Sequence, residues 1–215
     1  MPLPVILWGA AAALGLWAVH EFFSEDEKEK IEDKRIVILG DRAVGKTHLY
    51  DFLEKGKVPT SYEQTPIYGI EKLGLKIGKF NISGTDVRGS ENRGSHHSRW
   101  QDAMKEVDFL FYLVDAHKTL IEKDVTKIKN ECLLIIRFLK ENDNKKPDHI
   151  FIIGSHMDKI PNKNQKHEND FHTIKTIEEF RKELNRLNIK NTTILGNLRT
   201  DESAAKLVQE IIRSI

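Results

Sequence analysis

The chain has 215 residues and almost balanced charge, with 34 Lys and Arg against 33 Asp and Glu. This length suits one domain with a short appendage and leaves no room for a second enzyme domain. The balance gives no global basis for binding nucleic acid or a strongly acidic substrate, so no nucleic-acid partner is predicted. The single cysteine, Cys132, cannot form an internal disulfide, which fits a reducing compartment.

Residues 1–24 are predicted to form a transmembrane anchor. Residues 3–23 are nearly all apolar, interrupted only by Pro4, His20 and Glu21. At about 1.5 Å per residue, a helix of this length just spans a hydrocarbon core of about 30 Å. No Lys or Arg precedes the segment and several follow it, so the positive-inside rule places the rest of the chain in the cytoplasm. A basic start and a small-residue cleavage site are both missing, which predicts a retained single-pass span.

Residues 25–34 are rich in Glu and Lys and are predicted to be a charged tether, followed by one folded domain over residues 35–215. That domain begins with the apolar run 35–39, predicted to be a strand. The next eight residues form a complete phosphate-loop signature: Gly40, Asp41, Arg42, Ala43, Val44, Gly45, Lys46 and Thr47. A helix is predicted over residues 46–55. In this order the loop's backbone N–H groups surround phosphates, Lys46 supplies a cation, and the Thr47 hydroxyl is placed to coordinate Mg²⁺.

Downstream, strand-like runs alternate with helical stretches, which predicts an α/β domain with a doubly wound, mostly parallel six-stranded sheet. Gly78 marks a tight turn and the one antiparallel pair. The remaining predicted strands are 67–77, 79–83, 107–115, 149–154 and 192–198. The remaining predicted helices are 95–105, 120–141, 176–187 and 201–215. The polar segment 160–173 is predicted to be a surface loop, in contact with a partner.

With this order of elements the chain resembles the Ras-like small GTPases, the P-loop GTPases, over about residues 34–215. The resemblance implies GTP or GDP and Mg²⁺ as ligands. It also implies that Thr65, with Thr60 as an alternative, closes over the terminal phosphate and Mg²⁺. Asp86-Val-Arg-Gly89 matches the family's Asp-x-x-Gly: Asp86 holds Mg²⁺ through water, and the N–H of Gly89 reaches the terminal phosphate. In pattern, the stretch from Trp100 to Asp115 is most similar to the Arf and Sar branch and to the β subunit of the signal-recognition-particle receptor.

Two motifs depart from the family pattern. The residue after Gly89 is Ser90, where relatives that hydrolyse GTP usually carry the glutamine that orients water. No catalytic residue is therefore assigned, and intrinsic hydrolysis is predicted to be slow. His96 and His97 are the nearest titratable alternatives.

The family's base-recognition sequence, Asn/Thr-Lys-x-Asp, is here Ser155-His156-Met157-Asp158. The Asp158 carboxylate can accept the guanine N1–H and amino protons, which adenine does not offer in this pattern. His156 is placed to stack on the base where relatives have lysine, and Ser155 replaces the residue that ties the loops together. The last nucleotide-binding element is predicted at Asn197 and Leu198, after the sixth strand. The resemblance also extends the nucleotide contacts past Thr47 to His48.

The sequence thus predicts a membrane-anchored, GTP-binding switch that acts on a protein effector or membrane partner. The alternative is a pseudo-GTPase scaffold that binds nucleotide and recruits a partner without efficient turnover. A P-loop ATPase fragment is a third interpretation, which Asp158 and the absence of a long second module disfavour.

Overall fold

The computed structural model describes residues 34–55, 57–59, 72–77, 80–86, 100–101, 103–105, 107–141, 146–161 and 165–215. The predicted anchor at residues 1–24 and the tether up to residue 33 lie outside this part. Among the described helices, none combines the length and the apolar character needed to cross a membrane.

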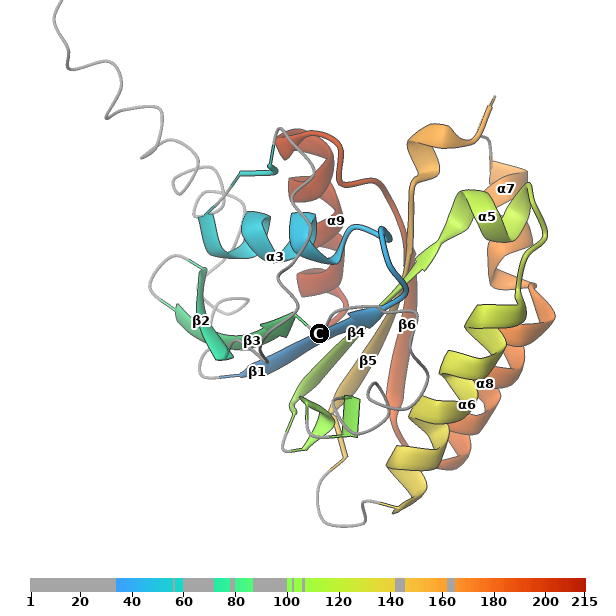
Figure 1. Cartoon of the computed structure of the whole chain (residues 1–215), viewed down its shortest axis with the longest axis horizontal. Helices are drawn as coiled ribbons and strands as arrows, with labels where there is room; N and C mark the ends of the chain where they lie inside the picture. Colours follow the sequence, from blue (N-terminus) through green and yellow to red (C-terminus); the bar gives the residue numbers. More distant parts are fainter. Residues whose placement is uncertain are drawn as a thin grey trace, which may run out of the picture.

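A six-stranded sheet forms the centre of the domain, in the order β2-β3-β1-β4-β5-β6 (Figure 1). β1 pairs in parallel with β3 and β4, β5 pairs in parallel with β4 and β6, and β2 is antiparallel to β3. The predicted mostly parallel sheet with one antiparallel pair is confirmed. The strands are β1 (Arg35–Gly40), β2 (Lys72–Ile77), β3 (Phe80–Asp86), β4 (Phe109–Asp115), β5 (His149–Ser155) and β6 (Lys190–Leu195).

Helices cover both faces of the sheet, as the doubly wound prediction requires (Figure 1). Successive residues of β1, β4 and β5 alternate between two apolar clusters, because side chains along a strand point to opposite faces. One cluster includes α3 and α9, and the other includes α6 and α8. The helices are α3 (Lys46–Lys55), α5 (Ala116–Leu120), α6 (Thr126–Glu141), α7 (Gln165–His172), α8 (Lys175–Arg186) and α9 (Asp201–Arg213), with a 3₁₀ turn at Met157–Lys159.

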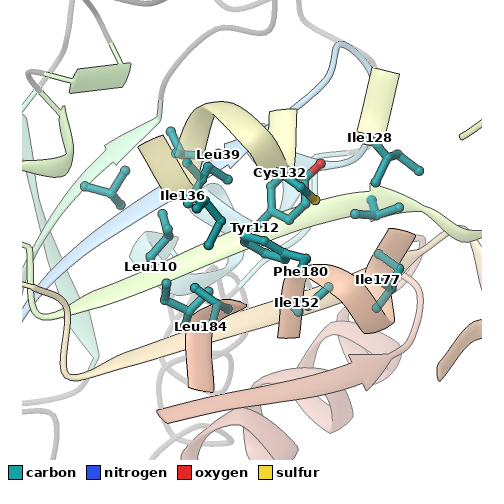
Figure 2. Packing of buried hydrophobic residues seen from close by; sticks show 14 of the residues in the cluster. Leu39, Leu110, Tyr112, Ile128, Cys132, Ile136, Ile152, Ile177, Phe180 and Leu184 are labelled. Atoms are coloured by element: carbon teal, nitrogen blue, oxygen red, sulfur yellow. The ribbon is translucent and has the colours of Figure 1, made fainter. Parts of the chain in front are cut away.

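The ring of Tyr112 lies at the centre of the α6 and α8 side (Figure 2). It is fully buried and meets Phe180 of α8 edge to face, with ring centroids 5.8 Å apart. Cys132 of α6 lies on the other side of the tyrosine, as Figure 2 shows, and is itself buried. The packing of Tyr112, Phe180 and Cys132 fixes α6 against β4, and this places the start of α6 next to the loop that follows β1.

The structure corrects three of the predicted elements. The predicted helix 120–141 begins only at Thr126, as α6, and the residues before it form a separate short helix, α5, whose N-cap Asp115 accepts the N–H of Lys118. The predicted loop 160–173 contains α7, which is anchored by the fully buried Phe171. β6 starts two residues earlier than predicted and ends at Leu195, so residues 196–198 are a loop rather than a strand.

Candidate functional site

The phosphate loop connects the end of β1 to the start of α3, and the structure requires glycine at both Gly40 and Gly45. Gly40 has φ +143°, and a Cβ atom there would lie 2.4 Å from the backbone oxygen of Leu113. Gly45 has φ +94°, and a Cβ there would lie 2.9 Å from Cδ1 of Leu198. A side chain at either glycine would strain the backbone and displace β4 or the loop after β6. The curve of the loop is therefore set by close contact with two neighbouring elements.

Lys46 folds back over this loop. Its buried Nζ donates to the backbone oxygen of Asp41 at 2.8 Å and to that of Gly40 at 3.1 Å. A buried ammonium is stable only when its hydrogen bonds are made, and these two carbonyls fix its position at the N-terminus of α3. A helix N-terminus with a fixed lysine favours an anion, because both place positive charge at one point. Thr47 follows in the first turn, half-buried.

Helix α6 contributes two charged side chains to the phosphate loop that sequence reasoning did not identify. Lys127 Nζ lies 3.0 Å from Oδ2 of Asp41. One turn later, Glu131 accepts a hydrogen bond of 2.8 Å from the Tyr112 hydroxyl. Burial raises the pKa of Glu131 to about 7; the Tyr112 bond opposes this rise, and the charge of Asp41 adds to it. The four-residue spacing of Lys127 and Glu131 was the available signal, since it puts both on one face of a helix.

The predicted base-recognition residues follow β5. Ser155 is buried, and its Oγ donates to the Val114 backbone oxygen of β4 at 3.2 Å, which ties the ends of the two strands together. His156 has left-handed backbone angles, φ 59° and ψ 28°. Its Nδ1 lies 3.1 Å from Oδ2 of Asp115. Asp158 is exposed in the 3₁₀ turn, where its carboxylate can meet a ligand.

The environment of Asp115 favours its charged form. Burial alone would raise the pKa of this carboxyl, but hydrogen bonds from the His156 ring and the Lys118 N–H, with the nearby charges of His156 and Lys159, lower it to about 2. His48, in the first turn of α3, is electrostatically coupled to the same ring. Burial lowers the pKa of His48, Asp51 opposes this, and His156 adds to the lowering. The first turn of α3 and the loop after β5 therefore face one region.

The loop after β6 completes the arrangement. The backbone N–H of Met157 donates to the oxygen of Gly196 at 3.2 Å, and the N–H of Gly196 donates to the oxygen of Gly154 at 2.9 Å. Leu198 is buried beside Gly45. The Asn197 side-chain oxygen accepts the N–H of Arg199 at 3.3 Å. Three loops that are far apart in the sequence thus meet at the carboxyl ends of the parallel strands, where open α/β sheets bind ligands.

The comparisons with known proteins agree with this geometry. The model of the family described as "ADP-ribosylation factor family" matches residues 21–211. The chain belongs to the ADP-ribosylation factor family. The members of this family are small GTPases that act as nucleotide-dependent switches.

Two solved structures share the fold at low sequence identity. The first is the small GTPase Sar1 of Encephalitozoon cuniculi in complex with GDP. It is 12% identical, with 97% of this chain and 91% of that chain covered and a TM-score of 0.52. The second is the Arl6 (BBS3) small GTPase of Trypanosoma brucei with bound GppNp. It is 14% identical, with coverage of 84% and 98% and a TM-score of 0.57. A search of curated protein sequences returned no match.

For a chain of the ADP-ribosylation factor family, the structure brings together most of the predicted nucleotide contacts. Three segments converge at the carboxyl ends of the parallel strands: residues 40–48, the loop from Ser155 to Asp158, and residues 197–198. The backbone of Asp86 ends β3 and pairs with Ile38 of β1, immediately before the phosphate loop. Thr65, Gly89 and Ser90 lie outside the described residues, so their predicted roles stay predictions. Arg42 is exposed in the loop.

Proposed function

We propose that this chain is a membrane-anchored member of the ADP-ribosylation factor family that binds GTP and GDP with Mg²⁺ and hydrolyses GTP slowly. The observation that carries the proposal is the convergence of a preformed phosphate cradle, closed by Lys46, with the exposed carboxylate of Asp158. The cradle fits a di- or triphosphate because it combines a fixed ammonium with a helix N-terminus. Glycine at positions 40 and 45 keeps backbone N–H groups accessible to the phosphates.

Each part of the site has a distinct task in this proposal. The backbone of residues 41–45 and Lys46 bind the phosphates. Mg²⁺ is usually held by a few side chains, water and substrate phosphates, and Thr47, Thr65 and Asp86 would supply its protein contacts. Bound Mg²⁺ would neutralise charge on the phosphates. Asp158 would accept the two guanine protons while His156, held by Asp115, lies along the base.

Base selection is tested by changing the hydrogen-bonding character of one side chain. The full chain is titrated with GTP, GDP, ATP and xanthosine triphosphate in the presence of Mg²⁺. Asp158→Asn exchanges a carboxylate acceptor for an amide donor, so it is expected to lose GTP affinity and gain affinity for xanthosine triphosphate, whose ring carries an extra carbonyl. Asp170→Asn, an exposed aspartate on α7, is the matched control and should bind as wild type does. Equal wild-type affinity for ATP and GTP would overturn the guanine assignment.

Phosphate binding has its own test. Lys46→Ala removes the ammonium that lies over the loop, and it is expected to abolish binding of GTP and GDP alike. Retained binding in this variant would mean that the loop does not hold phosphates.

Ser90 favours a second candidate, the pseudo-GTPase scaffold. Serine is too short to orient water as the usual glutamine does, so turnover by the isolated chain is expected to be slow. Single-turnover hydrolysis of bound GTP, with and without membranes and lysate, separates the two candidates. Ser90→Gln is expected to raise the rate if the missing glutamine limits it. Tight binding without hydrolysis under every condition would leave only the scaffold.

Membrane attachment is proposed from residues 3–23, with the folded domain on the cytoplasmic side. The apolar length of this segment and the basic residues that follow it support this proposal. The full chain is expected to stay with membranes through alkaline carbonate extraction, and a chain beginning at residue 25 is expected to be released. In sealed vesicles the domain should be cleaved by protease added from the cytoplasmic side. Release of the full chain by carbonate would refute the anchor.

A further inference from the structure

The phosphate loop carries a negatively charged side chain at its second position, which is unfavourable for holding a polyanion. Asp41 directly follows Gly40, and only 25% of its side chain is exposed. Its backbone oxygen accepts the shorter of the two Lys46 hydrogen bonds, at 2.8 Å. One residue therefore both supports the phosphate-binding cation and places a carboxylate beside the phosphate site.

Lys127 compensates this charge from a different element. Its Nζ lies 3.0 Å from Oδ2 of Asp41, although the two residues are 86 positions apart. The Asp41 bond, the largest effect, raises the pKa of Lys127, so the ammonium stays charged. Lys127 lies in the first turn of α6, and the Tyr112–Glu131 hydrogen bond fastens the next turn to β4. The lysine is thus presented to the loop by a helix whose position the core fixes (Figure 2).

We propose that Lys127 is a positioning residue of the phosphate site, which neutralises Asp41 and holds the Asp41 peptide against Lys46. This proposal rests on the proposed nucleotide binding and adds to it a residue from α6. Its main consequence is electrostatic. Without Lys127 the Asp41 carboxylate repels the phosphates, and the repulsion grows with the number of phosphate charges. Loss of affinity should therefore be larger for GTP than for GDP and should diminish with added salt.

The test is a double-mutant cycle on the full chain, in which Mg²⁺-dependent binding of fluorescent GTP and GDP analogues is measured at low and high salt. Lys127→Ala is expected to weaken GTP binding about threefold to fivefold, because the Lys127 side chain is 66% exposed and solvent screens its ion pair. Lys127→Arg should retain the affinity. Asp41→Asn in the Lys127→Ala background should recover most of the loss, because it removes the uncompensated charge. Lys129→Ala, an exposed lysine on the same helix, should bind as wild type does.

The outcomes separate this inference from the proposed function. If the wild type binds GTP and Lys127→Ala binds equally well, the role of Lys127 is refuted and nucleotide binding stands. If the loss in Lys127→Ala persists after Asp41→Asn, or is the same for GTP and GDP, charge compensation is refuted. If the wild type binds neither nucleotide, the proposed function and this inference fail together. Circular dichroism of each variant establishes that the fold is retained.

Discussion

The buried His149 is expected to make the fold sensitive to mild acid. Its ring stacks on Phe151 with centroids 4.0 Å apart, and its Nε2 lies 2.9 Å from the Thr192 hydroxyl. Burial, with a smaller effect of Lys190, lowers the pKa of His149 from 6.5 to about 4. Because the folded-state pKa is depressed, the stabilisation is present above pH 6.5 and is lost as the pH falls toward 4. Between pH 7 and pH 5 the free energy of unfolding should therefore fall by about 2 kcal/mol, because the unfolded chain takes up a proton that the folded chain does not.

Urea unfolding of the full chain, followed by circular dichroism at pH 7, 6 and 5, measures this loss. His149→Gln keeps a polar group for Thr192 but cannot be protonated, so the variant should lose about 2 kcal/mol less than wild type over the same range. Ile150→Val is the control. This substitution of a buried neighbour on β5 should lower the free energy of unfolding by about 1 kcal/mol at every pH, without changing how stability depends on pH. An identical pH dependence in wild type and His149→Gln would refute the reasoning.

Three further changes test the site. Gly40→Ala places a Cβ 2.4 Å from a backbone oxygen at φ +143°, so it should cost about 2 kcal/mol of stability and at least ~tenfold in GTP affinity, measured by unfolding and titration. His156→Ala removes the ring that contacts Asp115 and leaves that carboxylate only the Lys118 N–H, so it should weaken GTP binding about tenfold, whereas His156→Lys should retain it. The pKa of Glu131 is about 7 in the folded state against 4.5 unfolded, so the wild type loses stability as the pH rises from 4.5 to 7; Glu131→Gln should gain stability relative to wild type across this window, with a larger advantage at pH 8 than at pH 5. A Glu131→Gln advantage that is equal at both pH values would contradict the assigned pKa.

The fold could be predicted well from the sequence where the signals are local. The apolar runs of β1, β4 and β5 are continuous because both faces are covered, and the glycine loop marks the start of α3. The errors arose where a tertiary contact overrides the local pattern. Phe171 makes α7 a helix in a polar segment by packing beside Gly154, with its ring 3.0 Å from a Cβ placed there. Asp115 caps the short helix α5, which was not predicted from the sequence, and the predicted helix 120–141 begins only at Thr126.

In the candidate site, too, the residues with local sequence signals could be predicted and those that depend on tertiary contacts could not. Lys46, Thr47 and Asp158 could be predicted as site residues because their spacing from neighbouring strands is itself the signal. The four-residue spacing of Lys127 and Glu131 places both on one helix face but does not point to the phosphate loop, since an exposed lysine on a helix is ordinary until its partner is known. Asp41 lies 86 residues earlier, and only the pairing of β1 with β4 brings α6 to the phosphate loop.

The sequence by itself determined the order of elements, the phosphate-loop signature and the place of Asp158 directly after β5, because each depends on residues close together in the chain. Only the tertiary structure decided which charged side chains pair with one another and how burial shifts their pKa values. The ion pairs of Asp41 with Lys127 and of Asp115 with His156 join different elements. The raised pKa of Glu131 and the lowered pKa of His149 come from burial. Burial and long-range pairing are properties of the packed sheet and helices, and no local pattern encodes them.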